Sequence, residues 1–536
     1  MPDSDILIVG SGPAGVQSAW PLIKAGKNVT MLDGGNKSPH ILEESPSETF
    51  EDLRRTRADQ FRFLIGEDCS GIPVDGLRGG HGGGMTEGNR AFSVRDAANY
   101  LPLETGNSEI VQSLALGGLA SVWGGACSFL DMHELSAMGL PPLEIQRYYK
   151  TLACDIGISG PNTGIPLQPP LQPDHHAVRI LKNAERKKGS LEVMQMDIHQ
   201  PYAAVLTQNM GERKATNYGD MDYITNAGHA IYRPQYSLTE LKKYPNFQYR
   251  RMLVERIEEQ KGGICITGKA ISAETNMIQE TVKGRAVILA AGAIGTARIL
   301  LRSFGLYNHS IPFIAKPHDF FVCLHPAMIG SAGPKRRSSL CQLMIDDNER
   351  AVDGLNAACG LMFSYRSMQL FRLLSSIALP CPEAIALLSL WSPALSLVDV
   401  RYPARPHTES LLRLTLQDGK EKVSISIEVG QEEKERRAHA RKRMRKALRM
   451  LGLLPFKTIM LPEGSCSHYG GTVPPIAVQP NAPLTVDQDS RVTGTKSIFV
   501  ADASVFPCLP SKPHTLTIMT NARRIGTHLL SILDYT

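Results

Sequence analysis

The chain has 536 residues, of which 42% are hydrophobic and 21% are charged. This composition is typical of a soluble globular protein, and the length predicts two or more domains. The formal net charge of +6 is too small over this length to indicate a nucleic-acid-binding protein. The ten cysteines form no C-x-x-C pair, so neither a zinc site nor a redox disulfide is predicted, and no metal ligands are assigned.

The first predicted elements form a βαβ unit. Residues 6–9 are an apolar run typical of a buried parallel strand, and residues 10–15 follow with the pattern G-x-G-x-x-G. A helical pattern comes next and stops at Gly26, and a second strand at 29–32 ends in an acid. Such glycines let a pyrophosphate approach the backbone at a helix N-terminus, and the acid binds a ribose hydroxyl. We therefore predict a dinucleotide site that includes Gly10, Gly12, Pro13, Ala14, Gly15, Asp33 and Gly34.

Two further glycine-rich segments predict a backbone that passes close to a flat ligand. Residues 116–125 read LGGLASVWGG, and residues 286–296 give a buried strand followed by a glycine turn and a helix at 297–303. A third segment, at 76–84, is expected to be a loop near the cofactor, with His81 as an ordinary loop histidine. The cofactor-site residues predicted from the first two segments and from the strand at 247–257 are Gly117, Gly118, Ser121, Val122, Trp123, Val254, Ala291 and Gly292.

The remaining pattern predicts mixed α and β structure. A helix is expected at 141–160, and the proline-rich stretch 161–175 is a candidate domain boundary. Further strands are expected at 264–266, 270–274, within 316–345, and at 356–364, with a hairpin at 411–416 and 423–429 and a helix at 432–450. The helix carries a basic face, for which a solvated surface and an attraction to anionic lipid or a phosphorylated substrate are alternatives.

Residues 367–400 are the most hydrophobic part of the chain. Three prolines divide this stretch into pieces too short to span a bilayer. Two interpretations remain open: a buried helical pair of the second domain, or a substrate entrance that contacts a membrane surface. Because the residues before the first strand are polar, we expect a cytoplasmic protein, with membrane association through 367–400 as the alternative.

Two histidines near the C-terminus are the candidate catalytic residues. His468 lies in the sequence HYGGT, and His514 follows the run FVADASVFPCLPSKP. A neutral imidazole can take a proton from an alcohol, and its unperturbed pKa near 6.5 suits that task. Two imidazoles on either side of one hydroxyl could divide the work, one accepting the proton and one orienting the oxygen.

These motifs together resemble the glucose–methanol–choline (GMC) oxidoreductases. The resemblance covers the N-terminal fingerprint, residues 117–125, AAGAIGTARILL at 290–301, and residues 464–536. It implies an α/β fold with a Rossmann-like FAD-binding domain, similar also to p-hydroxybenzoate hydroxylase, and an α+β substrate domain. The implied FAD domain comprises residues 1–154, 246–309 and 456–536, and the implied substrate domain comprises 155–245 and 310–455.

The resemblance also implies the roles of the site residues. His468 matches the base that takes the alcohol proton in front of flavin N5, His514 matches the second catalytic position, and Asp502, Ala503 and Thr515 match residues beside FAD. Some pyranose oxidases of this family have a histidine bonded to FAD where this chain has Val122, so we expect FAD to be bound without a covalent link.

The implied reaction is oxidation of a CH–OH group to a carbonyl, with the hydride going to flavin N5. The segment around Val122 resembles the pyranose-oxidising branch, which favours a sugar or a sugar-bearing molecule as the substrate. Oxygen, a quinone and another redox partner are alternatives for the electron acceptor. The alternatives for the function are the same chemistry on a hydrophobic alcohol or sterol at a membrane, a lyase or isomerase reaction on the same fold, and a binding protein that retains FAD as a relic.

Overall fold

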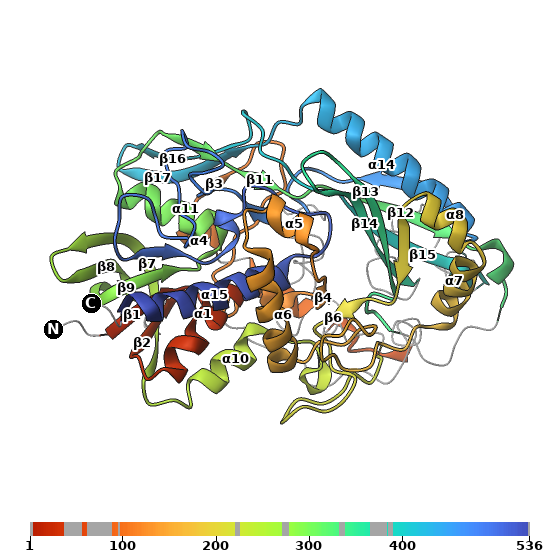
Figure 1. Cartoon of the computed structure of the whole chain (residues 1–536), viewed down its shortest axis with the longest axis horizontal. Helices are drawn as coiled ribbons and strands as arrows, with labels where there is room; N and C mark the ends of the chain where they lie inside the picture. Colours follow the sequence, from red (N-terminus) through yellow and green to blue (C-terminus); the bar gives the residue numbers. More distant parts are fainter. Residues whose placement is uncertain are drawn as a thin grey trace.

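The structure is a computed structural model of the chain, and it describes residues 4–36, 56–61, 88–94, 97–219, 226–270, 278–331, 338–364, 383 and 390–533. His81 and most of residues 367–400 lie outside these ranges. Two six-stranded sheets organise the molecule, one toward each end of its long axis, with α1 and α15 against the first and α14 along the second (Figure 1). Within the described ranges, a helix with the length and hydropathy of a bilayer span is not found.

The first sheet has a parallel core of five strands in the order β7-β2-β1-β9-β20. This is the order of doubly wound sheets, in which ligands bind outside the carboxyl ends of the strands. Beyond the core, β8 joins the extended ends of β7 and β9 in antiparallel pairing. The strands are β1 (Ser4–Val9), β2 (Val29–Asp33), β7 (Phe247–Gln260), β8 (Gly263–Ala270), β9 (Ile278–Leu289) and β20 (Ile498–Val500).

Strand β9 extends the strand predicted from residue 286 back to Ile278, and residues 271–274 of the strand predicted at 270–274 lie outside the described ranges. Strand β9 is one continuous strand, because its polar first half pairs with β8 and its fully buried second half pairs with β1.

Helices cover both faces of the parallel core. On one face, α1 (Pro13–Lys24) and α15 (Thr515–Leu533) pack over Ile6 and Ile8. The two helices approach closely at Gly526, where a Cβ atom would lie 2.3 Å from the Ser18 carbonyl oxygen. On the other face, α11 (Gly292–Ser303) packs in the cluster that contains Leu7.

The second sheet is antiparallel, with the strand order β18-β12-β15-β14-β13-β5. Its strands are β5 (Met196–His199), β12 (His318–Leu324), β13 (Leu343–Arg350), β14 (Asn356–Ser364), β15 (Leu395–Arg401) and β18 (Leu454–Met460). One face packs against α7 (His175–Arg186), α8 (Lys188–Val193) and α14 (Gln431–Met450). Because side chains alternate along a strand, the residues between these core positions face the other way, toward the first sheet.

The basic face of α14 is held by acidic partners on neighbouring elements. Arg441 donates to Asp319 at 2.7 Å and Arg437 to Glu463 at 2.5 Å, while Arg443 pairs with Asp347 at 2.7 Å. These contacts fasten the helix to the rest of the molecule and account for part of its charge, while the solvated surface and the attraction to anionic lipid or a phosphorylated substrate stay predictions.

The remaining elements connect the two sheets. The hairpin predicted at 411–416 and 423–429 is β16 and β17; it pairs with β10 and β3 and contributes to the core of the first sheet, although its residues fall in the expected substrate segment 310–455. The predicted helix at 141–160 is α6, which ends at Ile156 because Gly157 adopts a left-handed conformation (φ 73°). The other bounds are α4 (Ala97–Tyr100), α5 (Met132–Ala137), α10 (Pro234–Leu241), β3 (Leu103–Glu104), β4 (Ala126–Cys127), β6 (Tyr202–Ala203), β10 (Ser310–Pro312), β11 (Ile314–Ala315), β16 (Leu411–Gln417), β17 (Lys420–Ser426) and β19 (Tyr469–Gly470); α6 spans Pro142–Ile156.

Candidate active site

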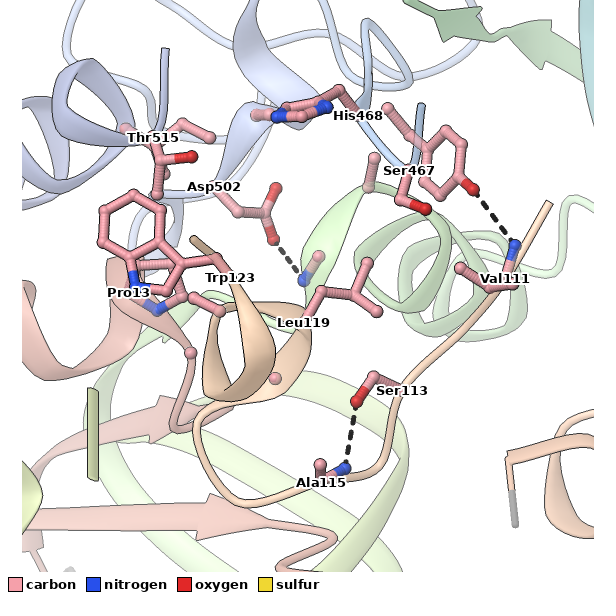
Figure 2. A pocket seen from close by; sticks show the side chains of 18 of the residues that line it. Pro13, Val111, Ser113, Ala115, Leu119, Trp123, Ser467, His468, Asp502 and Thr515 are labelled. Atoms are coloured by element: carbon pink, nitrogen blue, oxygen red, sulfur yellow. Dashed lines mark hydrogen bonds between the residues drawn. The ribbon is translucent and has the colours of Figure 1, made fainter. Parts of the chain in front are cut away.

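A cavity of about 380 Å³ lies between the two sheets. At one end it is lined by the glycine turn after β1, and at the other by side chains of the second sheet such as Phe320 and Phe363. Figure 2 shows part of its wall, with His468 and Thr515 at the top of the view and Pro13, Trp123 and Leu119 below them. One cavity therefore joins the predicted dinucleotide site to the predicted catalytic histidines.

The glycine end of the cavity has room that side chains would fill. A Cβ atom on Gly12 would lie 4.0 Å from the Gly117 carbonyl oxygen, and a Cβ atom on Gly292 would meet nothing within 4 Å. Both residues line the cavity. Gly10 has a different role, because it adopts φ +103° and a Cβ atom there would lie 2.4 Å from the Ala290 carbonyl oxygen. The backbone thus favours glycine at Gly10 and also at Gly292 (φ +77°), whereas Gly12 leaves space open for a ligand without such a backbone requirement.

Three helices begin at this cavity. Pro13 of α1, Gly292 of α11 and Thr515 of α15 are the first residues of their helices, and all three line it. The first N–H groups of a helix lack partners inside the helix, and the helix dipole places partial positive charge there. The cavity is therefore suited to an anionic group such as a pyrophosphate.

Asp33 ends β2 at the same edge of the sheet. Its carboxylate accepts hydrogen bonds from the Ser11 amide at 2.9 Å and from the Tyr249 hydroxyl at 3.2 Å. Ser11 in turn accepts from the Gly117 amide at 2.9 Å. Burial raises the pKa of Asp33, and these donors act against that rise. The network connects the two predicted glycine segments, which are more than a hundred residues apart.

Most of the predicted cofactor-site residues line the cavity, and four lie behind its wall. The lining residues are Gly10, Gly12, Pro13, Ala14, Asp33, Gly34, Gly118, Trp123, Val254, Ala291, Gly292, Asp502, Ala503, His514 and Thr515. Gly15 packs against the backbone of Gly10, where a Cβ atom would lie 1.9 Å from the carbonyl oxygen. Gly117, Ser121 and Val122 support the 117–125 segment from behind, with Ser121 and Val122 almost fully buried.

Asp502 binds the backbone amides of two segments that meet at the cavity. Its carboxylate accepts hydrogen bonds from the Gly292 amide at 2.9 Å, the Thr296 hydroxyl at 2.6 Å and the Ser504 amide at 2.9 Å. An acid beside the first turn of a helix stabilises that turn. This contact explains why α11 begins at Gly292, five residues before the helix predicted at 297–303.

The two candidate catalytic histidines face the cavity together. The centroids of the His468 and His514 rings are 5.1 Å apart, with an angle of 55° between the ring planes. His468 follows Ser467, which adopts a left-handed conformation (φ 58°) that is uncommon for a residue with a side chain. His514 directly precedes α15 and is 1% exposed. Both rings line the cavity.

A hydrogen bond to the backbone fixes the tautomer of His468. Its Nδ1 atom lies 2.6 Å from the Cys466 carbonyl oxygen. A carbonyl oxygen only accepts, so Nδ1 carries the proton and donates it, which leaves Nε2 with a free lone pair. His468 is therefore held in the tautomer that can accept a proton at Nε2.

The pKa values of both histidines differ from the sequence expectation of an unperturbed imidazole, which is wrong. Burial lowers the pKa of His468 and of His514 well below the usual value, and the nearby Lys316 lowers both further. Both rings are consequently neutral at physiological pH. A proton taken up by either ring is poorly retained, because its charge would be buried beside a cation.

The far wall of the cavity comes from alternate residues of the second sheet. His318, Phe320, Leu361, Phe363, Asp399 and Arg401 line it, whereas Phe321, Met362, Val398 and Val400 pack in the core behind them. Asp399 accepts from His318 Nδ1 at 2.8 Å and from Arg401 Nε at 2.9 Å. Although burial alone would raise the pKa of Asp399, Arg401 and His318 hold it well below its usual value. A buried charged pair thus lies among apolar and aromatic side chains.

The sequence prediction missed several of these residues. Asp399 and Arg401 carry a detectable signal, since charged residues two apart interrupt an apolar strand. Lys316 also carries one, because it ends an apolar run that begins at Ile311. The buried Arg90, which donates to the Val122 carbonyl oxygen, and Arg298 also line the cavity, and no local pattern marks either of them.

Comparisons with known proteins bear on the C-terminal part of the chain. Comparison with curated proteins finds no match. Residues 406–522 match the family model described as GMC oxidoreductase, for the C-terminal domain of that family. The matched segment includes His468 and His514 and all the residues between them. This match supports membership of the chain in the GMC oxidoreductases, a family that oxidises alcohol-type substrates.

Proposed function

We propose that the protein binds FAD without a covalent link and oxidises a CH–OH group of a sugar or sugar-bearing molecule to a carbonyl. The observation that carries this proposal is the position of His468 and His514 in the same cavity as the glycine turn after β1. FAD, when bound, supplies the acceptor for a hydride. We further propose that the first sheet with its helices is the FAD-binding domain and that the second sheet supplies the substrate side.

The residues present fit FAD. The open space at Gly12 and Gly292 would admit a flat or phosphorylated group close to the backbone. The N-termini of α1 and α15 would stabilise its pyrophosphate, and Asp33 would accept a ribose hydroxyl. The side chain of Val122 is 1% exposed and offers no atom that could bond to a flavin, which supports non-covalent binding.

The histidine pair supports alcohol oxidation because the hydroxyl proton needs an acceptor within reach. His468 Nε2 has a free lone pair, so it can take this proton as the C–H bond breaks. The neighbouring His514 can orient the hydroxyl oxygen by donating a hydrogen bond. The proton leaves the oxygen, the hydride leaves the carbon, and the carbonyl forms with no other atom lost.

The far wall of the cavity, formed by the second sheet, offers contacts for a polar sugar ring as well as for an apolar substrate. Phe320 and Phe363 offer flat apolar surface, while the Asp399–Arg401 pair offers an acceptor and donors for hydroxyl groups. The apolar residues Leu340 and Leu361 on the same wall favour a second candidate, a hydrophobic alcohol or sterol.

An anaerobic screen tests the proposal. Purified protein is reconstituted with FAD and mixed under argon with aldoses, polyols, benzyl alcohol and a sterol, and flavin absorbance is followed. Bleaching by a sugar is expected, whereas bleaching only by benzyl alcohol or the sterol would favour the second candidate. Acid precipitation of the reconstituted protein should release the flavin into the supernatant. Protein that does not take up FAD would contradict the proposal.

A further inference from the structure

Lys316 is a fully buried lysine that neither the glycine motif nor the histidine pair explains. Its exposure is 0%, although lysine is among the residues least often buried. It lies just after β11 (Ile314–Ala315), which pairs with β19 (Tyr469–Gly470), the strand that follows His468. A buried ammonium requires hydrogen-bond acceptors on its donors, so its partners indicate its role.

Lys316 contacts both catalytic segments. Its backbone amide donates to the His468 carbonyl oxygen at 2.9 Å. Its Nζ atom lies 2.8 Å from the Lys512 carbonyl oxygen, 2.9 Å from His514 Nδ1 and 3.5 Å from the Ser511 carbonyl oxygen. One residue thus fixes the main chain of the first histidine and touches the ring of the second.

We propose that Lys316 is a positioning residue that assigns opposite roles to the two histidines. A lysine ammonium has three donors and no acceptor. When it donates to His514 Nδ1, that nitrogen holds a lone pair, and the ring proton must be on Nε2. His514 is then a hydrogen-bond donor from Nε2, while His468, which donates from Nδ1 to Cys466, accepts at Nε2. This inference rests on the proposed alcohol oxidation, which needs one nitrogen of each kind.

The arrangement depends on the charge of Lys316. A neutral amine has two N–H donors and one lone pair, so it could accept a hydrogen bond from His514 Nδ1–H, in the tautomer that leaves Nε2 without a proton. Burial lowers the pKa of Lys316 to about 7. The titratable and charged groups around it are His468, His514, Cys466, Cys359, Asp399 and Arg401. The charged form of Lys316 therefore requires the donor form of His514, and deprotonation of Lys316 near this pH permits the other tautomer as well.

The first experiment observes the tautomer without any substrate. Protein labelled with ¹⁵N-histidine is titrated over roughly two pH units on either side of the Lys316 pKa of about 7, and H514Q assigns the His514 signals. We expect Nδ1 to be unprotonated and Nε2 protonated at low pH, with a change near neutrality. A protonated Nδ1 throughout the titration would overturn the proposal. This outcome does not depend on which alcohol is oxidised, so a failure of the proposed function remains distinguishable.

The second experiment uses Lys316→Met, with Lys496→Met as a control at an exposed position. Flavin reduction is measured against pH with the sugar that reduces the wild type fastest. The wild type and K496M should lose rate as the pH rises through neutrality. K316M should be about tenfold to hundredfold slower at low pH, by analogy with the loss of groups that orient metal-binding histidines, and should lack this decline. An equal slowing of K316M at every pH, with the decline retained, would indicate a structural role only.

Folding of K316M is checked by thermal unfolding. A methionine of similar length no longer requires burial of a charge, so the midpoint should be unchanged or higher. If K316M does not fold, the ¹⁵N titration of the wild type decides the proposal by itself.

Discussion

The two ends of the cavity are built in different ways. At the glycine end, short backbone turns and helix N-termini supply the binding groups, and the decisive feature of Gly12 is the side chain it lacks. At the histidine end, buried side chains from distant segments hold each other, as Lys316 does with His514 and Arg401 with Asp399. Binding at the glycine end depends on open space, and the residues that form its turn are neighbours in the sequence. The histidine end depends on charge and hydrogen bonds between residues that are far apart in the sequence.

Removing the proton acceptor should give the largest effect and tests whether the histidine end performs the chemistry. In His468→Asn the side chain can still form hydrogen bonds but cannot take up a proton at neutral pH. We expect the rate of flavin reduction to fall by about 10²- to 10⁴-fold, the usual contribution of a general base, with FAD affinity unchanged. The exposed His309 provides the control, since H309N should reduce at the wild-type rate. Unaltered reduction in H468N would separate the histidine end from the reaction.

Breaking the charged pair should give the next largest effect, now on stability. Asp399→Asn removes the carboxylate from the mostly buried Arg401, whose side chain is 15% exposed, and loss of one partner of a buried pair costs about 3–5 kcal/mol. The control is Glu432→Gln, because the exposed pair with Arg436 should contribute less than about 1 kcal/mol. Urea unfolding at neutral pH measures both variants. Equal stabilities of D399N and E432Q would show that the buried pair is not special.

The same variant gives a pH dependence with a fixed sign. The pKa of Asp399 is lowered in the folded protein, so the ionised carboxylate stabilises the fold above its unfolded value of about 3.9. This contribution is lost as the pH falls below that value toward the folded pKa. The difference in unfolding free energy between wild type and D399N should therefore shrink in acid, and a difference that is constant down to low pH would contradict this account.

Two alanine substitutions at the glycine end should give smaller and opposite effects. In Gly15→Ala the new Cβ atom would lie 1.9 Å from the Gly10 carbonyl oxygen, and we expect a loss of about 1–3 kcal/mol in the stability of the cofactor-free protein. In Gly12→Ala the Cβ atom has room in the protein, so the stability should be retained while FAD affinity falls. Thermal unfolding and FAD titration measure the two properties. Wild-type FAD affinity in G12A would show that this space is not used.

The glycine end could be predicted because its residues are neighbours in the sequence. Gly10 to Asp33 span one βαβ unit, and the strand, the turn and the second strand lie where the pattern predicted them. The distance between a glycine motif and the helix it opens is fixed by local geometry. The same argument placed the turn before α11, although not the first residue of that helix, which depends on Asp502.

The histidine end could be predicted only in part, because its geometry is tertiary. His468 and His514 were identified through motifs, but their neutral state depends on burial and on Lys316, which reaches them through the pairing of β11 with β19. The alternation in residues 395–401 identifies Asp399 and Arg401 as a pair on one face of a strand. Which face meets the cavity depends on α7 and α14 covering the other one, and no local pattern contains that information.

The alternation of side chains along the second sheet separates substitutions that affect folding from substitutions that affect the cavity. Phe321 and Met362 anchor the scaffold beneath the helices, while their neighbours Phe320, Leu361 and Phe363 line the cavity. A mutational library restricted to these three lining positions would therefore sample new selectivities for alcohols without disturbing the residues that keep the sheet folded. If the proposed oxidation holds, such a library would change which alcohol reacts while His468 and His514 stay in place.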